Sequence, residues 1–482
     1  MTNPLVQTDF YKADHRSQYP DGTSLVFSNF TARKSRLEGI DEVVFFGLSY
    51  YIEHFLIDEW KKNFFDLPKD EAVEQYRRRI TNAGINITYD HVEALWDKQY
   101  LPLAIWALPE GTAVPTNVPM LVLWNTEPEF FWLTNYLETS LSNSIWGPCT
   151  SATIAKEYRK ALVFAAENTG GSVDFVSWQG HDFSMRGMFG LEAAAMSGAG
   201  HLLSFTGTDT IPAIDFLERY YHADSDTELI GGSVAATEHS VMCMGTQEAE
   251  VETYRRLINE VYPKGIVSIV SDTWDYWGVW TSIIPELKAD ILAREGTVTI
   301  RPDSGDPVKI ICGDPKAAPG SPEYRGSFEL AWEIFGGTVN DKGFKQLNPC
   351  INLIYGDSIT MDRCDEILTG LVEKGFVPSM VFGIGSYTYQ HVTRDTFGFA
   401  MKATYGEVNG EPREIFKDPK TDNTGKRSAK GLLAVDIVDG KPVLTQQATW
   451  PMVLGCDFEQ RFVDGVHYNQ PTLAEIRERV QA

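Results

Sequence analysis

The sequence predicts an α/β protein whose larger part is an irregular (β/α) barrel. From residue 172 onward, short apolar runs recur, each followed by a polar turn and then by a helical or irregular stretch, which is typical of βα units in a parallel sheet. The runs are almost continuously apolar, which indicates strands buried on both faces. Polar residues gather where each run ends, as in a barrel whose site is built at the carboxyl ends of its strands, so we favour a barrel over an open doubly wound sheet. The runs span residues 175–178, 202–205, 267–270, 298–300, 353–355 and 381–382.

The two ends of the chain predict a second, mixed α+β domain. We place the barrel at residues 149–395 and the second domain at residues 1–148, joined by an antiparallel tail at 396–482. Residues 313–349, rich in Pro and Gly, predict an insertion in the barrel around one helix at 327–335. The elements expected outside the barrel are strands at 23–30 and 120–123, helices at 47–65 and 129–144, a hairpin at 437–444 with an Asp-Gly turn, and a basic, turn-rich loop at 417–430.

Composition limits the partners of this protein. With 482 residues, a formal charge of -24 and 43% apolar residues, the chain can fold around large cores but offers no excess of positive charge to nucleic acid or to an anionic membrane. The six cysteines form no CxxC pair or zinc spacing, so we expect free thiols in a reducing compartment. The first ten residues are polar and no apolar run is long enough to cross a membrane, so we expect a cytoplasmic protein.

One stretch, residues 231–240, has the composition of a binding loop. Its sequence, Gly-Gly-Ser-Val-Ala-Ala-Thr-Glu-His-Ser, contains no large apolar side chain, which predicts a loop with accessible backbone amides rather than a core strand or a packed helix. His239 is its only side chain able to act as a nucleophile or proton carrier near neutral pH. Glu238 or another carboxylate would orient the ring. The alternative is a surface turn with a solvated histidine.

The expected barrel rim combines arginines with carboxylates. Guanidinium groups bind phosphate in pairs of hydrogen bonds, and Mg²⁺ prefers oxygen ligands, so this combination favours a phosphorylated sugar and a divalent cation. For any single arginine, a surface ion pair is the alternative. No GxGxxG follows the first strand and no P-loop occurs, so a dinucleotide or Walker-type site is not indicated. The rim residues are Asp182, Arg186, Asp209, Glu238, His239, Asp272, Arg301, Asp303, Asp357 and Arg394.

An ordered set of short motifs resembles the nicotinamide phosphoribosyltransferase family over nearly the whole chain. Any one of these motifs alone would be weak, whereas their order along the chain is specific. They are Thr8-Asp9-Phe10-Tyr11-Lys12, His181-Asp182-Phe183 with Arg186-Gly187, Gly207-Thr208-Asp209-Thr210, Glu238-His239-Ser240, Arg301-Pro302-Asp303-Ser304-Gly305, Gly356-Asp357, Thr393-Arg394-Asp395, Phe416-Lys417-Asp418-Pro419 and Lys426-Arg427-Ser428.

The resemblance implies transfer of phosphoribosyl from phosphoribosyl pyrophosphate to nicotinamide, with Mg²⁺ held mainly through the pyrophosphate. Phe183 would stack on the pyridine ring, and Asp209 would accept a hydrogen bond from the carboxamide. Tyr11 and Arg33 would come from the partner subunit of a homodimer, and Asp9 is a further substrate-binding residue. The other implied contacts are Arg186, His239 and Arg301 at the pyrophosphate, Asp303 at the ribose hydroxyls, and Gly356, Asp357, Gly385, Ser386, Arg394 and Lys402 around the nucleotide phosphate and ribose.

The resemblance also implies that ATP phosphorylates His239 as an optional step that drives turnover. Two departures from the family lie at the phosphate site: Gly383-Ile384-Gly385-Ser386 replaces a run of glycines, and Ala400 replaces a serine. Nicotinate phosphoribosyltransferase is the nearest alternative, although Asp209 argues against an anionic substrate. A silent interaction protein is a further alternative, which the intact motifs disfavour. A sugar-phosphate aldolase would need a lysine at a strand end, and none occurs there.

Overall fold

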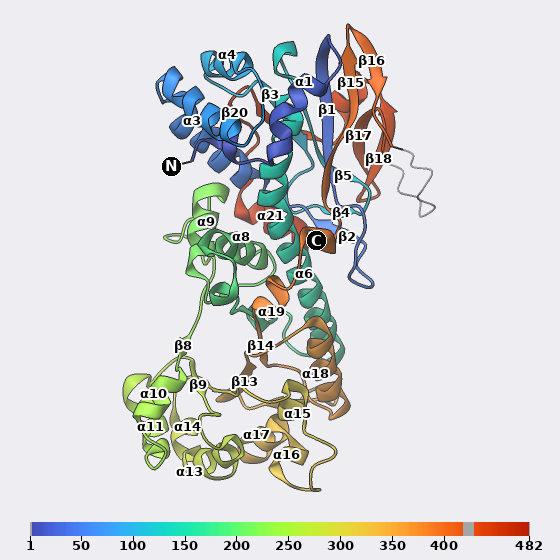
Figure 1. The fold of residues 1–482 in the computed structure, drawn as a ribbon. Helices are drawn as coiled ribbons and strands as arrows, with labels where there is room; N and C mark the ends of the chain where they lie inside the picture. The colour runs from blue at the N-terminus through green and yellow to red at the C-terminus, as the bar shows by residue number, and fades with distance from the viewer. Residues whose placement is uncertain (1, 418–428, 482) are drawn as a thin grey trace. The chain divides into compact units, whose positions relative to one another are not determined.

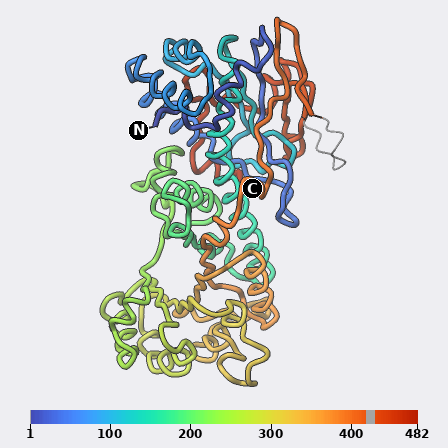
Figure 2. Tube along the Cα trace, in the orientation of Figure 1, coloured from blue at the N-terminus to red at the C-terminus, as the bar shows by residue number. Residues whose placement is uncertain are grey.

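The computed structural model describes residues 2–417 and 429–481 and divides the chain into two compact units. Unit 1 contains Met1–Thr153, Phe216–Ala223 and Val392–Ala482, and unit 2 contains Ile154–Asp215 and Asp224–His391. The Cα trace shows N-terminal segments in blue and C-terminal segments in orange and red interleaved within unit 1 (Figure 2). Both ends of the chain therefore contribute to one folded body.

Unit 2 is built on a parallel sheet that curls into an irregular barrel. Leaving the inserted hairpin aside, each of its seven strands lies beside a strand that precedes or follows it in the chain, and β6 also pairs with β14. All of these pairings are parallel. A parallel bridge between Gly207 and Gly232 joins the two edges of the sheet, with hydrogen bonds from Thr208 N to Gly232 O and from Gly232 N to Thr206 O. The predicted barrel is confirmed. Its strands, in spatial order, are β7 (Gly207–Thr208), β6 (Gly180–Asp182), β14 (Val381–Ile384), β13 (Ile351–Tyr355), β10 (Val298–Arg301), β9 (Val267–Val270) and β8 (Ala235–Ala236).

Helices alternate with these strands and lie outside them (Figure 1). The predicted insertion carries a helix at the expected place, α17 (Ser327–Phe335), and a small hairpin of β11 (Gly337–Val339) and β12 (Lys345–Leu347). The remaining helices of unit 2 are α7 (Val176–Gln179), α8 (Leu191–His201), α10 (His239–Met244), α11 (Glu250–Arg256), α12 (Tyr276–Gly278), α13 (Ile284–Glu286), α14 (Lys288–Ala293), α15 (Pro307–Cys312), α16 (Pro322–Arg325), α18 (Met361–Glu373) and α19 (Ser386–Tyr389).

Unit 1 contains a seven-stranded antiparallel sheet, which places β1 from the N-terminal part between β15 and β5. The predicted Asp-Gly hairpin is confirmed: Asp439 and Gly440 both have positive φ angles, of 51° and 78°, as a type I′ turn requires. This hairpin joins β17 (Leu432–Val438) to β18 (Lys441–Ala448). The large sheet runs in the order β16 (Glu411–Glu414), β15 (Ala400–Val408), β1 (Thr23–Thr31), β5 (Pro119–Asn125), β3 (Leu103–Ala107), β19 (Glu459–Val463) and β20 (Val466–His467).

The helices of unit 1 include the predicted helical stretch at 47–65, which begins with α2 (Leu48–Tyr50) and continues as two π-helical segments. The prediction of one helix at 129–144 is wrong in its bounds: α5 covers Leu133–Tyr136, and α6 runs from Glu138 to Thr169 through Pro148. The other helices are α1 (His15–Gln18), α3 (Lys69–Asn82), α4 (Asp90–Lys98), α20 (Trp450–Gly455) and α21 (Leu473–Gln481), and the short strands β2 (Glu42–Val44) and β4 (Ala113–Pro115) pair with each other.

Residues 216–223, the second part of α9 (Ile211–Tyr221) and the turn after it, belong to unit 1 because of their aromatic side chains. The Phe216 ring lies 4.9 Å from that of Tyr50, and Tyr221 lies 4.8 Å from Phe46. The Tyr221 hydroxyl also donates to the buried carboxylate of Glu110 at 2.9 Å. These contacts pack residues 216–223 into unit 1.

Two predicted barrel strands are wrong. Residues 175–178 overlap helix α7 and residues 202–205 follow helix α8, whereas the strands β6 and β7 lie a few residues later. The Phe205 ring packs so closely on Gly180 that a Cβ there would lie 2.7 Å from it. The apolar runs therefore fill the space beside short strands instead of forming them. A short apolar run that forms a strand and one that packs beside a strand look alike in sequence.

Several smaller expectations have a clear outcome. All six cysteines are free, as predicted. In the described residues, no helix is long and apolar enough to cross a membrane. The predicted loop at 417–430 and the motif at 426–428 lie almost entirely outside the described residues.

Candidate active site

The carboxyl ends of the barrel strands carry ten of the fifteen site residues predicted from sequence. Phe183 and Arg186 follow β6, Asp209 follows β7, and His239 begins α10 after β8. Because the strands are parallel, these ends meet on one edge of the barrel. The others are Arg301 and Asp303 at the end of β10, Gly356 and Asp357 after β13, and Gly385 and Ser386 after β14.

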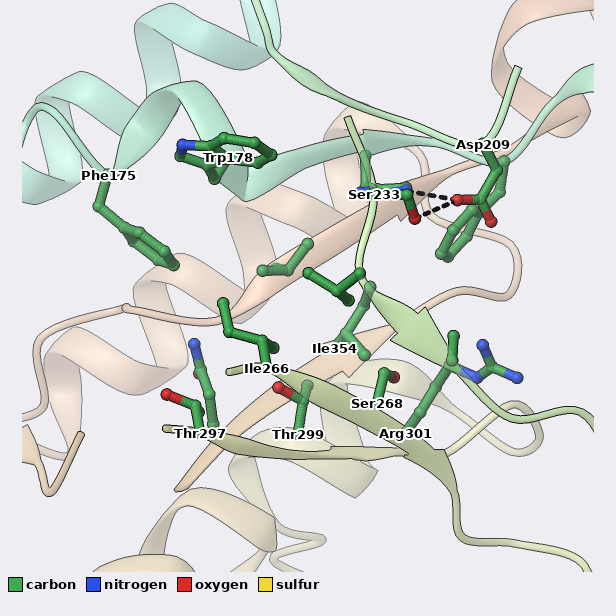
Figure 3. Close-up of a pocket in the computed structure, with 16 residues that line it drawn as sticks. Phe175, Trp178, Asp209, Ser233, Ile266, Ser268, Thr297, Thr299, Arg301 and Ile354 are labelled. Carbon is green, nitrogen blue, oxygen red and sulfur yellow. Dashed lines mark hydrogen bonds and ion pairs between the residues drawn. The ribbon is translucent and has the colours of Figure 1, made fainter. Parts of the chain in front are cut away.

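Two cavities of unit 2 share Phe183 and Asp209. The first, of about 410 Å³, is lined by these two residues, by Arg301, by the aromatic rings of Phe175 and Trp178, and by residues in and next to the strands (Figure 3). The second, of about 470 Å³, is lined by Phe183, Asp209 and Arg186 with neighbouring residues of the segment 185–191. Phe183 and Asp209 therefore border two adjacent cavities of the size that small-molecule sites usually have, with one arginine in the lining of each.

Two glycines position the Phe183 ring. A Cβ at Gly383 would lie 2.4 Å from the ring and one at Gly356 would lie 3.1 Å from it, so both backbones pack directly on the aromatic side chain. Phe183 N also donates to Ile384 O at 2.9 Å. Any larger residue at 383 would displace the ring, so the glycine keeps one face of the cavity aromatic.

Asp209 is held by two side-chain donors. His181 Nε2 lies 2.9 Å from Asp209 Oδ1, and Ser233 Oγ donates to the same oxygen at 2.6 Å (Figure 3). Burial alone would raise the pKa of the Asp209 carboxyl, but these hydrogen bonds and the nearby Arg301 outweigh burial and lower it. Asp209 is therefore an anion at neutral pH, with a hydrogen-bond acceptor facing the two cavities.

His239 is oriented by Asp272. Its Nε2 lies 3.0 Å from Asp272 Oδ1, while the other oxygen of Asp272 accepts from Asp303 N at 3.1 Å and from Ser304 Oγ at 2.5 Å. Of the two orienting groups left open by the sequence, Glu238 is not used, because it accepts a hydrogen bond from Ser240. Asp272 thus ties the loop after β8 to the loop after β10.

The segment 231–240 is not the continuous loop that its composition predicts. Ala235–Ala236 form β8, paired with Val267 and Ser268 of β9, and His239 starts helix α10. Backbone hydrogen bonds of a strand need no large side chain, so composition alone could not reveal this edge of the barrel.

Arg301 has a guanidinium group without a carboxylate partner among the described residues. Nη2 donates to Thr237 O at 2.6 Å, and Nε is buried with no hydrogen-bond partner there. A buried guanidinium nitrogen with an unused donor is costly unless a ligand supplies the acceptor. This residue is therefore suited to an anionic group such as a phosphate.

The five other predicted site residues lie in unit 1. Asp9 accepts from Thr139 Oγ1 at 2.7 Å, and Tyr11 is 58% exposed. Arg33 Nε donates to Gly398 O at 3.0 Å. Arg394 lies next to these backbone contacts in the segment Arg394–Thr396, where Arg36 N donates to Thr396 O.

Lys402 completes a group of cations within unit 1. Burial lowers the pKa of its ammonium group, Glu138 opposes that shift, and the positive charges of Arg33 and Lys12 add to it. Lys12 forms an ion pair with Glu138, and Lys402 lies 3.9 Å from the same carboxylate. These basic side chains repel one another, which an incoming anion would relieve.

Three further residues contact the predicted site residues. Asp272, one of the carboxylates expected at the rim, orients His239, whereas His181 and Ser233, which sequence placed in a motif and in a predicted loop, hold Asp209. The signal for His181 was its spacing of two from Phe183, which puts both side chains on one face of a strand. Asp182, expected at the rim, is fully buried and accepts from Ser184 N.

No group of three His, Cys, Asp or Glu side chains that could hold a metal ion occurs in residues 2–417 and 429–481. Asp303 and Asp357 are the carboxylates at the ends of β10 and β13 that lie among the predicted phosphoribosyl contacts. A divalent cation here would need oxygen ligands from a bound phosphate as well.

Comparisons with known proteins indicate one family of phosphoribosyltransferases over nearly the whole chain. Residues 178–460 match the nicotinate phosphoribosyltransferase (NAPRTase) family, and residues 3–86 match the nicotinamide phosphoribosyltransferase N-terminal domain. The chain is 53% identical to the nicotinamide phosphoribosyltransferase of Acinetobacter baylyi over 493 residues, covering 99% of this chain and 97% of the other. It is 34% identical to that of Mycoplasma pneumoniae over 450 residues, covering 89% and 94%.

Solved structures show the same fold at low sequence identity. Nicotinate-nucleotide pyrophosphorylase from Pyrococcus furiosus superposes with a TM-score of 0.60 at 15% identity, covering 99% of this chain and 95% of the other. Human nicotinic acid phosphoribosyltransferase gives 0.56 at 15% identity, covering 98% and 93%. With the sequence matches and the barrel site described above, the chain belongs to the nicotinate phosphoribosyltransferase family, within its nicotinamide phosphoribosyltransferase members.

Proposed function

We propose that this protein transfers the phosphoribosyl group of phosphoribosyl pyrophosphate to nicotinamide, giving nicotinamide mononucleotide and pyrophosphate for NAD salvage. The observation that carries this proposal is the juxtaposition of Phe183, Asp209 and Arg301 around one cavity. An aromatic face suits a flat pyridine ring, an acceptor suits its carboxamide, and an unpaired guanidinium suits a phosphate. The kinship with nicotinamide phosphoribosyltransferases supports the same reaction.

The reaction displaces pyrophosphate at the anomeric carbon of the ribose, with the pyridine nitrogen forming the new bond. The ring nitrogen is neutral, so no general base is required. The protein's task is to align the two reactants and to stabilise the charge on the departing pyrophosphate. Arg301 and Arg186 would do the latter and Asp303 would hold the ribose hydroxyls. Gly356, Asp357, Gly385 and Ser386, which also follow barrel strands, would surround the ribose and its phosphate. Mg²⁺, bound mainly through the pyrophosphate, would neutralise part of that charge.

Product analysis tests this function directly. The purified protein is incubated with Mg²⁺, phosphoribosyl pyrophosphate and either nicotinamide or nicotinate, and the mononucleotide is quantified. We expect nicotinamide mononucleotide at a rate well above that of nicotinate mononucleotide. A preference for nicotinate would favour the alternative function of a nicotinate phosphoribosyltransferase, and the absence of both products would contradict the proposal.

ATP is proposed as an optional second substrate that phosphorylates His239. Asp272 Oδ1 accepts a hydrogen bond from Nε2 of this imidazole, so the other ring nitrogen, Nδ1, keeps its lone pair for attack on the γ-phosphorus, with ADP as the leaving group. The side chain is 47% exposed, as a group that exchanges phosphate must be. Phosphohistidine would then raise the affinity for substrate and drive turnover forward.

Replacing His239 by alanine is expected to preserve basal phosphoribosyl transfer and to abolish its stimulation by ATP. The reason is that the imidazole accepts phosphate, whereas the anomeric carbon is attacked by the substrate nitrogen. Rates with and without ATP, and acid-labile label from γ-³²P-ATP, measure the two effects. His222→Ala, which removes an exposed histidine of unit 1, is the matched control. Undiminished ATP stimulation in His239→Ala would refute this role.

The active form is proposed to be a homodimer in which each site takes residues from both subunits. Tyr11 is exposed in unit 1, and the predicted set of contacts is divided between the two units. Tyr11 would cover the second face of the pyridine ring bound on Phe183 of the partner subunit. Asp9, Arg33, Arg394 and Lys402 of unit 1 would add to the phosphate and ribose contacts.

Two inactive variants are expected to recover activity when they are combined in one dimer. Tyr11→Ala and Asp303→Ala damage opposite contributions to a shared site, so a mixed dimer contains one site with both residues intact. After co-refolding, activity should rise above that of either variant alone, toward about a quarter of wild type if mixing is random, because half of the dimers are then mixed and each mixed dimer has one intact site of two. Mixed dimers shown to form by differential tagging, yet without recovered activity, would contradict shared sites.

A cytoplasmic location is part of the proposal. Six free cysteines fit a reducing compartment, and phosphoribosyl pyrophosphate and ATP are intracellular metabolites. Cell fractionation followed by activity measurement checks it.

A further inference from the structure

His181 occupies a position that the proposed reaction does not use. It lies in β6 beside Gly207 of β7, its register partner. A Cβ at Gly207 would lie 2.7 Å from His181 Nδ1, so only glycine leaves room for the imidazole there. On its other side, the ring centroid lies 4.8 Å from that of Phe183. The imidazole is 8% exposed and is therefore fixed in place by its neighbours.

This ring points one nitrogen at the Asp209 carboxylate. A carboxylate oxygen only accepts hydrogen bonds, so the proton of neutral His181 lies on Nε2, 2.9 Å from Asp209 Oδ1. Ser233 Oγ donates to the same oxygen. Among the described residues, no hydrogen bond is made to Asp209 Oδ2. Two donors on one oxygen fix the carboxylate and leave the second oxygen for a ligand.

We propose that His181 is the positioning residue that sets the choice between a carboxamide and a carboxylate on the pyridine ring. This inference rests on the proposed function. Neutral His181, together with Ser233, turns Asp209 so that its free oxygen accepts from a carboxamide NH₂. Protonated His181 balances the charge of Asp209, so the site tolerates a ligand carboxylate better. His181 touches neither the reacting atoms nor the pyrophosphate and acts through Asp209.

The charged groups around His181 favour a change in substrate preference when its imidazole gains a proton. The groups that face it are Asp209, the buried Asp182 of the same strand, the buried His201 behind β7, and Arg301, which acts on Asp209. His201 is kept neutral, because burial lowers its pKa to about 4. A proton gained by the His181 imidazole would place a positive charge 2.9 Å from the Asp209 carboxylate.

The test measures kcat/KM for nicotinamide and for nicotinate from pH 6 to pH 8 and takes their ratio. A change of protonation that acts on phosphoribosyl pyrophosphate affects both reactions alike and cancels in that ratio. For the wild type, the ratio is expected to fall about threefold or more as the pH falls from 8 to 6, because an added positive charge offsets the repulsion of nicotinate. His181→Gln places an amide donor near Nε2 but cannot gain a proton, so its ratio should not change with pH.

Two further variants separate positioning from folding. His181→Leu lacks any donor and is expected to raise KM for nicotinamide about fivefold or more while kcat changes little, because a charge-assisted hydrogen bond that orients Asp209 is lost. Ser233→Ala should also raise KM for nicotinamide, and its ratio of kcat/KM values should still change with pH. His222→Gln, the same substitution at an exposed histidine of unit 1, is the control.

Each outcome has a distinct meaning. A wild-type ratio that does not change with pH, in an enzyme active with nicotinamide, overturns this inference and leaves the proposed function intact. A His181→Gln ratio that varies with pH as in the wild type overturns it as well. If His181→Leu does not fold, the wild-type and His181→Gln profiles still decide. An enzyme inactive with both substrates overturns the proposed function and this inference together.

Discussion

Asp209→Asn is expected to lower the preference for nicotinamide over nicotinate at least tenfold, measured as the ratio of the two kcat/KM values. Two like charges about 4 Å apart repel by roughly 4 kcal/mol at an effective dielectric of 20, which corresponds to about a thousandfold. The side chain of Asp209 is 49% exposed, so solvent screens part of this repulsion, and tenfold is the lower bound.

The geometry indicates that this substitution does more than remove a negative charge. His181 and Ser233 both donate to Oδ1, so an asparagine would keep its oxygen there and turn its NH₂ toward the ligand. That NH₂ donates to nicotinate and no longer accepts from nicotinamide.

The alternative is that Asp209 caps the following helix, in which case Asn would preserve the cap and the preference. The carboxylate makes no hydrogen bond to amides of α9 among the described residues. An unchanged ratio in a folded, active Asp209→Asn variant would nevertheless return the residue to a structural role.

The largest expected loss of stability follows from Arg461→Met. Arg461 and Glu110 are fully buried and form an ion pair at 2.9 Å, which joins β19 to the loop between β3 and β4 in unit 1. Removing one partner leaves a buried charge without a counterion, and we expect a decrease of about 3–5 kcal/mol in the free energy of unfolding. Urea unfolding followed by tryptophan fluorescence measures it.

Two comparisons test the cause of this loss. In Glu110→Gln/Arg461→Met, no uncompensated charge remains, so much of the stability should return. Arg77→Met breaks an ion pair of which both partners are about half exposed and should cost at most about 1 kcal/mol. An Arg461→Met variant no less stable than Arg77→Met would contradict the argument.

The same pair predicts how the stability of unit 1 depends on pH. Burial would raise the pKa of Glu110, but Arg461 and hydrogen bonds from Ser49 and Tyr221 outweigh it and lower the pKa. Because the folded-state pKa is lowered, this contribution is fully present above the unfolded value of about 4.3 and is lost as the pH falls through the folded value.

The sequence by itself determined the features that depend on local pattern. Continuous apolar strands followed by polar turns predicted β9, β10, β13 and β14 of the barrel, because a buried parallel strand needs such a run. The Asp439-Gly440 turn was predicted because its positive φ angles suit these two residues.

The tertiary structure alone decided the features that depend on distant segments meeting. β6, β7 and β8 have two or three residues each, and backbone pairing with neighbouring strands rather than their side chains makes them strands. Residues 216–223 belong to unit 1 because their aromatic rings pack there. His239 pairs with Asp272 and not with its neighbour Glu238, and His181 meets Asp209, because parallel strands bring together side chains that are about thirty residues apart. Such pairings follow from strand register, which no local sequence pattern encodes.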